Sequence, residues 1–276
     1  MTGDNIPNPM EHHRLESFTS DGLTRPVYWS KGGARRSVVI VCHEMPGITP
    51  EFIGFVQFLE MAGFATVVPH LFGEVGRRMT VGYLVRTGIR VCIAREFHVL
   101  AGGHASPIAG WLRALAREAS IRHDVGRVGA IGMCFTGNFA IGMLLEPVVT
   151  RAVASQPSLP FAVWPGLGEA LHQSPDETAR LAARLGPDGD AQAMALRFSG
   201  DRLCPAARFA NLQSVLGGGL ETIVIDSGRG NAHGIKRLAH SVLTIDLVDD
   251  TAHPTYQARE RVLSFLSEGL RTQTTP

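Results

Sequence analysis

The chain has 276 residues, of which 45% are hydrophobic, and its 26 Lys and Arg residues nearly balance its 25 Asp and Glu residues, for a formal charge of +1. This length and apolar content suit one large α/β domain better than two small domains. No basic run is longer than Arg35-Arg36 or Arg77-Arg78, so neither nucleic acid nor an anionic membrane surface is an expected partner.

Targeting and metal-binding signals are also missing from the sequence. No apolar run approaches the roughly 20 residues of a membrane-spanning helix, and the first residues lack the basic start and apolar stretch of a signal peptide. We therefore expect a cytoplasmic protein. The cysteines, which form no Cys-x-x-Cys pair, are Cys42, Cys92, Cys134 and Cys204. Neither a disulfide framework nor a structural zinc is predicted, and no other metal or cofactor is expected.

Predicted strands and helices alternate along most of the chain. Residues 1–12 are polar and expected to be loose, and residues 15–29 have the pattern of a short hairpin. Apolar runs of strand length predict buried strands at residues 37–42, 64–69, 127–133, 151–154, 194–199 and 221–225. Helices are predicted at residues 50–62, 79–96, 108–118, 137–145 and 254–270. This alternation predicts an α/β fold with a mostly parallel central sheet and helices on both faces.

The predicted domain organisation is simple. Residues 13–272 are expected to form a single domain, followed by a short tail at residues 273–276. Within it, residues 166–190 contain a Pro-Asp-Glu helix start and a Gly-Pro-Asp-Gly-Asp turn, so we interpret them as a helical excursion or loop.

The most informative segment surrounds Cys134. Residues 128–140 read as a buried strand, a sharp turn and a helix start, with Gly132 two positions before the cysteine. This is the pattern of a nucleophile elbow, in which the side chain stands at the start of a helix whose dipole favours a thiolate. A small cysteine that only packs the core would fit the same residues, so both interpretations stay open here.

Other polar groups follow predicted strands directly. Ligands of open α/β sheets bind beyond the carboxyl ends of the strands, so Glu44 after the first apolar run and Asp201 after a later one are candidate site residues. A loop carboxylate and a turn or N-cap Asp are the ordinary alternatives. A base that follows the nucleophile and the Asp in chain order would be His233 or His240, since His253 reads as a capping or surface residue. His43 and His70 end strands and are candidates for lining the cleft.

Taken together, these residues resemble the dienelactone hydrolase family of α/β-hydrolases, over about residues 37–266. The resemblance rests on His-Glu-Met-Pro-Gly at residues 43–47, on residues 67–73, on Gly-Met-Cys-Phe-Thr-Gly at residues 132–137, and on Gly200-Asp201 with a late His. It implies the α/β-hydrolase fold and hydrolysis of a small-molecule ester or lactone, as by a carboxymethylenebutenolidase, through a thioester acyl-enzyme.

The resemblance also implies a role for each residue of a Cys-His-Asp triad. Cys134 would be the nucleophile, Asp201 the orienting acid, a late His the base, and Glu44 the group in contact with the resting thiol. The backbone N–H groups of Phe135 and Met45 would form the oxyanion hole. Family spacing between the base and the Phe-Leu pair of the closing helix favours His240, with His233 as the alternative.

The chain departs from the family pattern at two places. Thr136 stands where the family usually has Gly, and Glu74 stands near the place where an Arg for the substrate carboxylate would be expected. Either another cation serves or the substrate is not an anionic lactone. The residues predicted to border the substrate are Phe72, Arg77 and Arg237.

Two other classes of function remain as alternatives. One is a non-catalytic module of the same fold that binds a small molecule or a protein. The other is a cysteine-based transferase or thiol-redox enzyme, which the lack of a Cys-x-x-Cys pair disfavours. The sequence leaves open a monomer or a small homo-oligomer.

Overall fold

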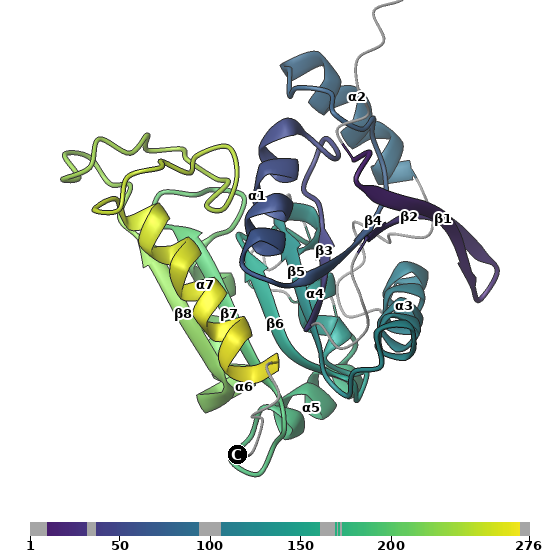
Figure 1. Ribbon diagram of the computed structural model, residues 1–276. Coiled ribbons are helices and arrows are strands. Elements are labelled where there is room, and N and C mark those ends of the chain that lie inside the picture. Colours follow the sequence, from purple (N-terminus) through teal and green to yellow (C-terminus); the bar gives the residue numbers. More distant parts are fainter. Residues whose placement is uncertain are drawn as a thin grey trace, which may run out of the picture.

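A single twisted sheet organises the chain (Figure 1). The computed structural model describes residues 10–31, 37–93, 106–160, 169, 171 and 173–270. In these residues eight strands pair in the order β1-β2-β4-β3-β5-β6-β7-β8. They are β1 (His13–Ser20), β2 (Leu23–Ser30), β3 (Val38–Cys42), β4 (Ala65–Pro69), β5 (Val128–Met133), β6 (Val149–Ser155), β7 (Gln192–Phe198) and β8 (Leu220–Ile225). Strands β3 to β8 are parallel and the β1–β2 hairpin is antiparallel, which confirms the predicted α/β fold.

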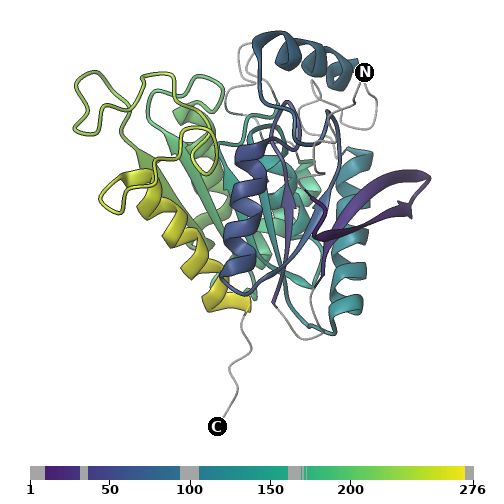
Figure 2. The same cartoon turned by 45° about the horizontal axis from the view of Figure 1, so that its top comes forward.

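Helices cover both faces of the sheet (Figures 1 and 2). They are α1 (Pro50–Met61), α2 (Val81–Ile93), α3 (Pro107–His123), α4 (Gly137–Met143), α5 (Pro175–Arg184), α6 (Ala206–Leu216) and α7 (Pro254–Leu270). Residues of α1 and α7 pack in one core layer, and residues of α3, α4 and α6 pack in the other. No helix in the described ranges has the length and apolar character needed to cross a lipid bilayer.

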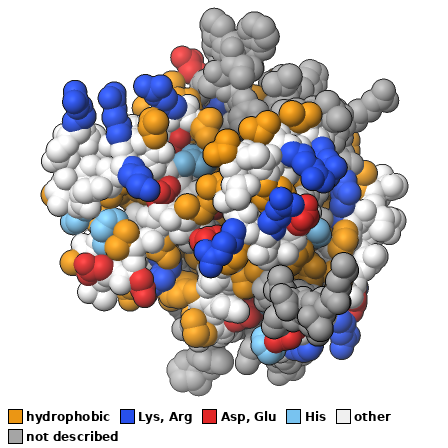
Figure 3. All heavy atoms as spheres, turned by 90° about the horizontal axis from the view of Figure 1, so that it is seen from above, with side chains coloured by type: hydrophobic (Ala, Val, Ile, Leu, Met, Phe, Trp, Pro, Cys, Tyr) orange, Lys and Arg blue, Asp and Glu red, His pale blue; other side chains and the backbone are white. Residues whose placement is uncertain are grey.

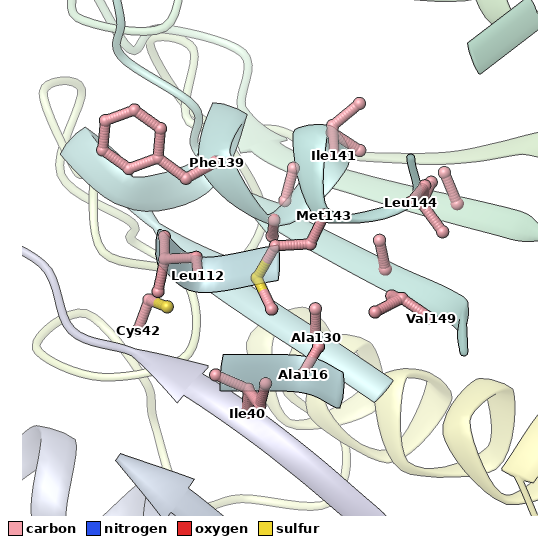
Figure 4. Packing of buried hydrophobic residues seen from close by; sticks show 14 of the residues in the cluster. Ile40, Cys42, Leu112, Ala116, Ala130, Phe139, Ile141, Met143, Leu144 and Val149 are labelled. Atoms are coloured by element: carbon pink, nitrogen blue, oxygen red, sulfur yellow. The ribbon is translucent and has the colours of Figure 1, made fainter. Parts of the chain in front are cut away.

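The strands are apolar throughout because both of their faces are buried. In β3, Ile40 and Cys42 enter the layer under α3 and α4, whereas Val39 and Val41 enter the layer under α1 and α7. Figure 4 shows the first layer, where the Met143 side chain of α4 points toward the strand residue Ala130. Successive side chains of the strand therefore alternate between the two faces of the sheet. The sequence does not show this alternation, because both faces are apolar.

Several element boundaries differ from the predicted ones. Helix α3 continues to His123, beyond the predicted end at residue 118, and stops where Asp124 adopts a left-handed conformation at φ +52°. Helix α5 lies within residues 166–190, and α6 begins just after Pro205. Residues 1–9, 94–96 and 273–276 of the predicted segments lie outside the described residues.

The parallel strands end at one edge of the sheet, which forms the upper side of Figures 1 and 2. The segment after β8, residues 226–253, contains neither helix nor strand and lies at this edge, as does α2. The candidate functional residues all follow strands at this same edge.

Candidate active site

Cys134 occupies a sharp turn between β5 and α4. Its φ of +53° lies in the left-handed region, a backbone conformation that residues other than glycine rarely adopt. A Cβ at Gly132 would come within 2.2 Å of the Thr136 carbonyl oxygen, and a Cβ at Gly137 within 2.8 Å of the Pro157 Cα. Both glycines are therefore required by close backbone approaches, and the turn has the form of a nucleophile elbow. The Cys134 side chain is buried, with 6% of the residue exposed.

Thr136 ties the elbow to the end of β3. Its fully buried hydroxyl accepts a hydrogen bond from the Met133 backbone N–H at 2.9 Å. The hydroxyl oxygen also lies 3.0 Å from the Cys42 carbonyl and 3.2 Å from the His43 carbonyl, to which it can donate. The departure from the family pattern at Thr136 is thus a polar cross-link between two loops.

His240 and Asp201 are hydrogen-bonded to each other. His240 Nδ1 donates to Asp201 Oδ2 at 2.7 Å, while Asp201 Oδ1 accepts from the backbone N–H groups of Leu203 and Cys204 at 2.9 and 3.2 Å. The His240 backbone N–H donates to Asp246 Oδ2 at 2.8 Å. The imidazole is therefore held through both its ring and its backbone, with Nδ1 protonated and Nε2 left as the acceptor.

The electrostatics of His240 couple it to Cys134. Burial by itself lowers the pKa of His240, but the charge of the Cys134 sulfur and the hydrogen bond to Asp201 outweigh it and raise the pKa well above its usual value. His240 Nε2 is buried, and Cys134 raises the pKa of the ring both through its charge and as a hydrogen-bond partner. An imidazole with a raised pKa beside a thiol is suited to accept the thiol proton.

His233 lies elsewhere. It is exposed, its ring packs against that of His253 at a centroid distance of 5.4 Å, and its backbone N–H donates to Asn231 Oδ1 at 3.2 Å. The structure thus brings His240, and not the alternative His233, to Asp201.

Glu44 is buried under the loop that carries His240. Its Oε2 accepts hydrogen bonds from Ser241 Oγ at 2.7 Å and Gln156 Nε2 at 3.3 Å, and its Oε1 accepts one from the Thr244 hydroxyl. The predicted contact with the Cys134 thiol is not among the hydrogen bonds of the described residues, because these three donors occupy the carboxylate. Glu44 therefore braces the loop after β8 against the end of β3.

Replacing Glu44 with Gln should change how stability depends on pH. Burial raises the pKa of Glu44 above its usual value of 4.5, although the hydroxyls of Thr244 and Ser241 oppose the shift. A raised folded-state pKa means that wild-type stability is greatest at low pH and falls as pH rises through that pKa. Gln does not ionise, and its amide can donate to the Thr244 hydroxyl while its oxygen accepts from Ser241.

We expect Glu44→Gln to gain stability relative to wild type, by about 1 kcal/mol, as pH rises above the usual glutamate pKa in urea unfolding. Glu74→Gln, which removes an exposed carboxylate, serves as the control. Parallel pH curves for wild type and Glu44→Gln would contradict the expectation.

His43 fixes the loop that follows β3. The fully buried ring donates from Nδ1 to the Glu44 carbonyl at 3.1 Å and accepts at Nε2 from the Leu71 N–H at 3.1 Å. Burial lowers the pKa of His43 to about 3, so the ring stays neutral. His43 therefore does not line a cleft; it joins the loops after β3 and β4, and the first of these contains Met45.

Arg208 supports the opposite side of the elbow. This fully buried side chain donates to the carbonyls of Pro157 at 3.0 Å and Leu203 at 3.2 Å, and also to that of Pro160. The neighbouring Ser158 N–H donates to the Cys134 carbonyl at 3.0 Å. Sequence reasoning missed Arg208 because nothing in α6 marks a cation whose partners are carbonyls of distant loops.

The residues predicted to border the substrate have different surroundings. Phe72 packs edge-to-face on Phe135, with ring centroids 5.4 Å apart, and so lies beside the elbow. Arg77 pairs with Glu74 at 2.8 Å and stacks on the Tyr83 ring at 4.4 Å. Arg237 is exposed, and its carbonyl closely approaches Gly200, beside the Asp201 turn. Of the two arginines, only Arg237 lacks an ion-pair partner in the described part of the chain.

The described residues contain no group of three or more His, Cys, Asp or Glu side chains placed to hold a metal ion. The groups gathered at the sheet edge are instead a thiol, an imidazole and a carboxylate, of which the imidazole and the carboxylate are hydrogen-bonded at 2.7 Å. Such an arrangement suits nucleophilic and acid–base chemistry by side chains.

Comparisons with known proteins identify the family and the fold of the chain. The family model of the dienelactone hydrolase family matches residues 26–268. No curated protein sequence matches the chain. Among solved structures, one assigned as a dienelactone hydrolase from Klebsiella pneumoniae subsp. pneumoniae MGH 78578 is similar, with a TM-score of 0.61 at 17% identity over 93% of this chain and 98% of that one.

Two further structures share the fold. A dienelactone hydrolase-like promiscuous phosphotriesterase from metagenomic libraries has a TM-score of 0.59 at 16% identity, over 94% of this chain and 98% of its own. A thermophilic esterase from the Planctomycetes species Thermogutta terrifontis has a TM-score of 0.58 at 13% identity, over 97% of this chain and 96% of its own. At these identities the similarity is one of fold.

Proposed function

The chain belongs to the dienelactone hydrolase family, and we propose that it hydrolyses a small carboxylic ester or lactone through Cys134, His240 and Asp201. The observation that carries the proposal is the 2.7 Å bond between His240 and Asp201, which leaves Nε2 free beside the elbow cysteine. Asp201 would hold the imidazole in the required tautomer and stabilise its protonated form.

In the first half-reaction, the Cys134 thiol proton passes to His240 Nε2 and the sulfur forms a bond to the acyl carbon. The backbone N–H groups of Phe135 and Met45 would hold the oxyanion, and such donors typically contribute about 3 kcal/mol of barrier lowering each. The carbon–oxygen bond to the leaving group then breaks, and His240 returns its proton to the leaving alkoxide.

In the second half-reaction, His240 takes a proton from water as the water oxygen attacks the thioester carbon. The carbon–sulfur bond breaks, the acid is released, and the proton on His240 restores the thiol. No redox partner is required, since the net reaction adds one water across the ester bond.

We place the substrate among neutral esters and lactones in preference to anionic ones. Arg77 is already paired with Glu74, and the exposed arginines beside the Asp201 turn are Arg202, the next residue, and Arg237, whose carbonyl approaches Gly200. Specificity like that of a carboxymethylenebutenolidase would require one of these exposed arginines to bind the substrate carboxylate, and neither is held in place by an ion pair in the described residues. The non-catalytic alternative has no observation in its favour among the described residues.

A direct test is to trap the acyl-enzyme. The protein is mixed with an aryl acetate, quenched in acid, digested and analysed by mass spectrometry. We expect one added acetyl group on the peptide that contains Cys134, and its loss on treatment with hydroxylamine, as a thioester requires. Turnover with the acetyl group on any other residue would refute the proposed nucleophile.

A further inference from the structure

Helix α2 presents an apolar surface to solvent. Val81, Val85 and Ile89 are 80%, 55% and 60% exposed. The buried side of the helix consists instead of Tyr83, Thr87 and Val91. A surface helix ordinarily turns its apolar side toward the core. Of twelve exposed large hydrophobic residues in the described chain, five lie in one eleven-residue stretch, so they form a patch and not a scatter. This α2 patch consists of Met79, Val81, Leu84, Val85 and Ile89.

The α2 patch lies at the rim of the proposed active site. The buried Tyr83 hydroxyl accepts from the Glu74 N–H and lies 2.7 Å from the position of a Cβ at Gly73 and 3.2 Å from one at Gly47. Gly47 and Gly73 belong to the loops after β3 and β4, which border the elbow. Further exposed apolar side chains, Leu203 and Leu238, lie close in sequence to Asp201 and His240.

Basic side chains surround the apolar ones. The exposed cations without an ion-pair partner in the described parts of these loops and of α2 are Arg78, Arg86, Arg90, Arg202, Arg229, Lys236 and Arg237. Of the exposed carboxylates in the same segments, Glu74 is paired with Arg77 and Asp249 with Arg259, so the seven unpaired cations outnumber the two remaining carboxylates, Asp226 and Asp250. Figure 3 looks onto this face and shows apolar and basic side chains side by side.

We propose that this face docks the protein onto the surface of an anionic lipid bilayer. Apolar side chains of a basic amphipathic helix enter the boundary between headgroups and acyl chains, and each neighbouring Lys or Arg adds attraction to anionic lipid. A second copy of the chain would bring an equally basic face and be repelled. The formal charge of the whole chain is only +1, because acidic residues elsewhere balance the positive charge of this surface.

Sedimentation with lipid vesicles tests the proposal. We expect the protein to bind phosphatidylglycerol-containing vesicles at least tenfold more tightly than phosphatidylcholine vesicles, and less tightly as salt is raised. The double variant Val85→Asp/Ile89→Asp should weaken binding by about tenfold or more. Ile121→Asp, which changes a 74% exposed residue of α3 far from this face, should bind as wild type does.

Three outcomes would overturn the proposal: no vesicle binding, equal binding to both lipids, or equal loss in the Val85→Asp/Ile89→Asp and Ile121→Asp variants. Circular dichroism of each variant checks that it is folded. Concentration-dependent dimerisation of wild type, abolished in the double variant, would assign the face to a second copy instead. Binding does not depend on the proposed chemistry, so Cys134→Ala should bind vesicles normally even though it cannot form the acyl-enzyme.

Discussion

Replacing Cys134 with Ala is expected to lower kcat/KM for small aryl esters or lactones by about a thousandfold or more, since removal of a nucleophile disables the whole triad. The effect should appear in kcat, because the thiol makes its bond only as the reaction proceeds. The circular dichroism spectrum and the free energy of unfolding in urea should stay close to those of wild type. Ala fits the space of the buried thiol, and the hydrogen bonds of the Thr136 hydroxyl do not involve the Cys134 side chain.

The matched control is Cys42→Ala. Cys42 is also buried and lies at the end of β3, but, unlike Cys134, it is not among the groups that shift the pKa of His240. Cys42→Ala should keep activity within a few-fold of wild type at a modest loss of stability. If Cys134→Ala retained full activity, or if both variants lost it equally, the nucleophile would have to lie elsewhere.

Acid should destabilise the protein through His43. The buried ring has its pKa lowered to about 3, whereas an unfolded His titrates near 6.5. A depressed folded-state pKa means that stability is complete above the unfolded pKa and is lost as pH falls toward the folded one. The contribution of His43 should therefore fall by about 1.4 kcal/mol per pH unit between about pH 6.5 and about pH 3.

The variant His43→Asn isolates this contribution. Asn can still donate to the Glu44 carbonyl but carries no titrating ring, so its unfolding free energy should decline less steeply in acid than that of wild type. Glu44 acts in the opposite direction over part of this range, and taking the difference between the two proteins removes its effect. His12→Asn, at an exposed position, should leave the slope unchanged. Equal slopes for wild type and His43→Asn would contradict the assignment of acid sensitivity to His43.

Most of the fold could be predicted from the sequence, because the patterns that indicate strands, helices and the elbow lie within short segments of the chain. Continuous apolar runs marked the strands of a sheet buried on both faces, and Gly132 with Cys134 marked the elbow. The order of Cys134, Asp201 and a late His reduced the candidates for the proposed base to two histidines. The geometry then separated them, since only His240 reaches Asp201.

What the sequence could not supply were contacts that depend on three-dimensional neighbours. Nothing near Glu44 announces Thr244, and the Thr136 hydroxyl meets carbonyls of a loop far upstream. Helical periodicity likewise predicted a helix with an apolar side for residues 79–96, but the pattern does not indicate whether that side faces the core or the solvent. The outward orientation of the α2 patch was therefore visible only in the structure.

The brace from Glu44 to Thr244 joins positions 200 residues apart, which has a consequence for synthesis on the ribosome. The elbow cysteine leaves the exit tunnel long before the imidazole, and the loop that carries the imidazole gains its anchor only after the last strand has emerged. An incomplete nascent chain therefore holds its thiol without a base beside it. The proposed pair of Cys134 and His240 is therefore complete only once the last segment of the chain has emerged.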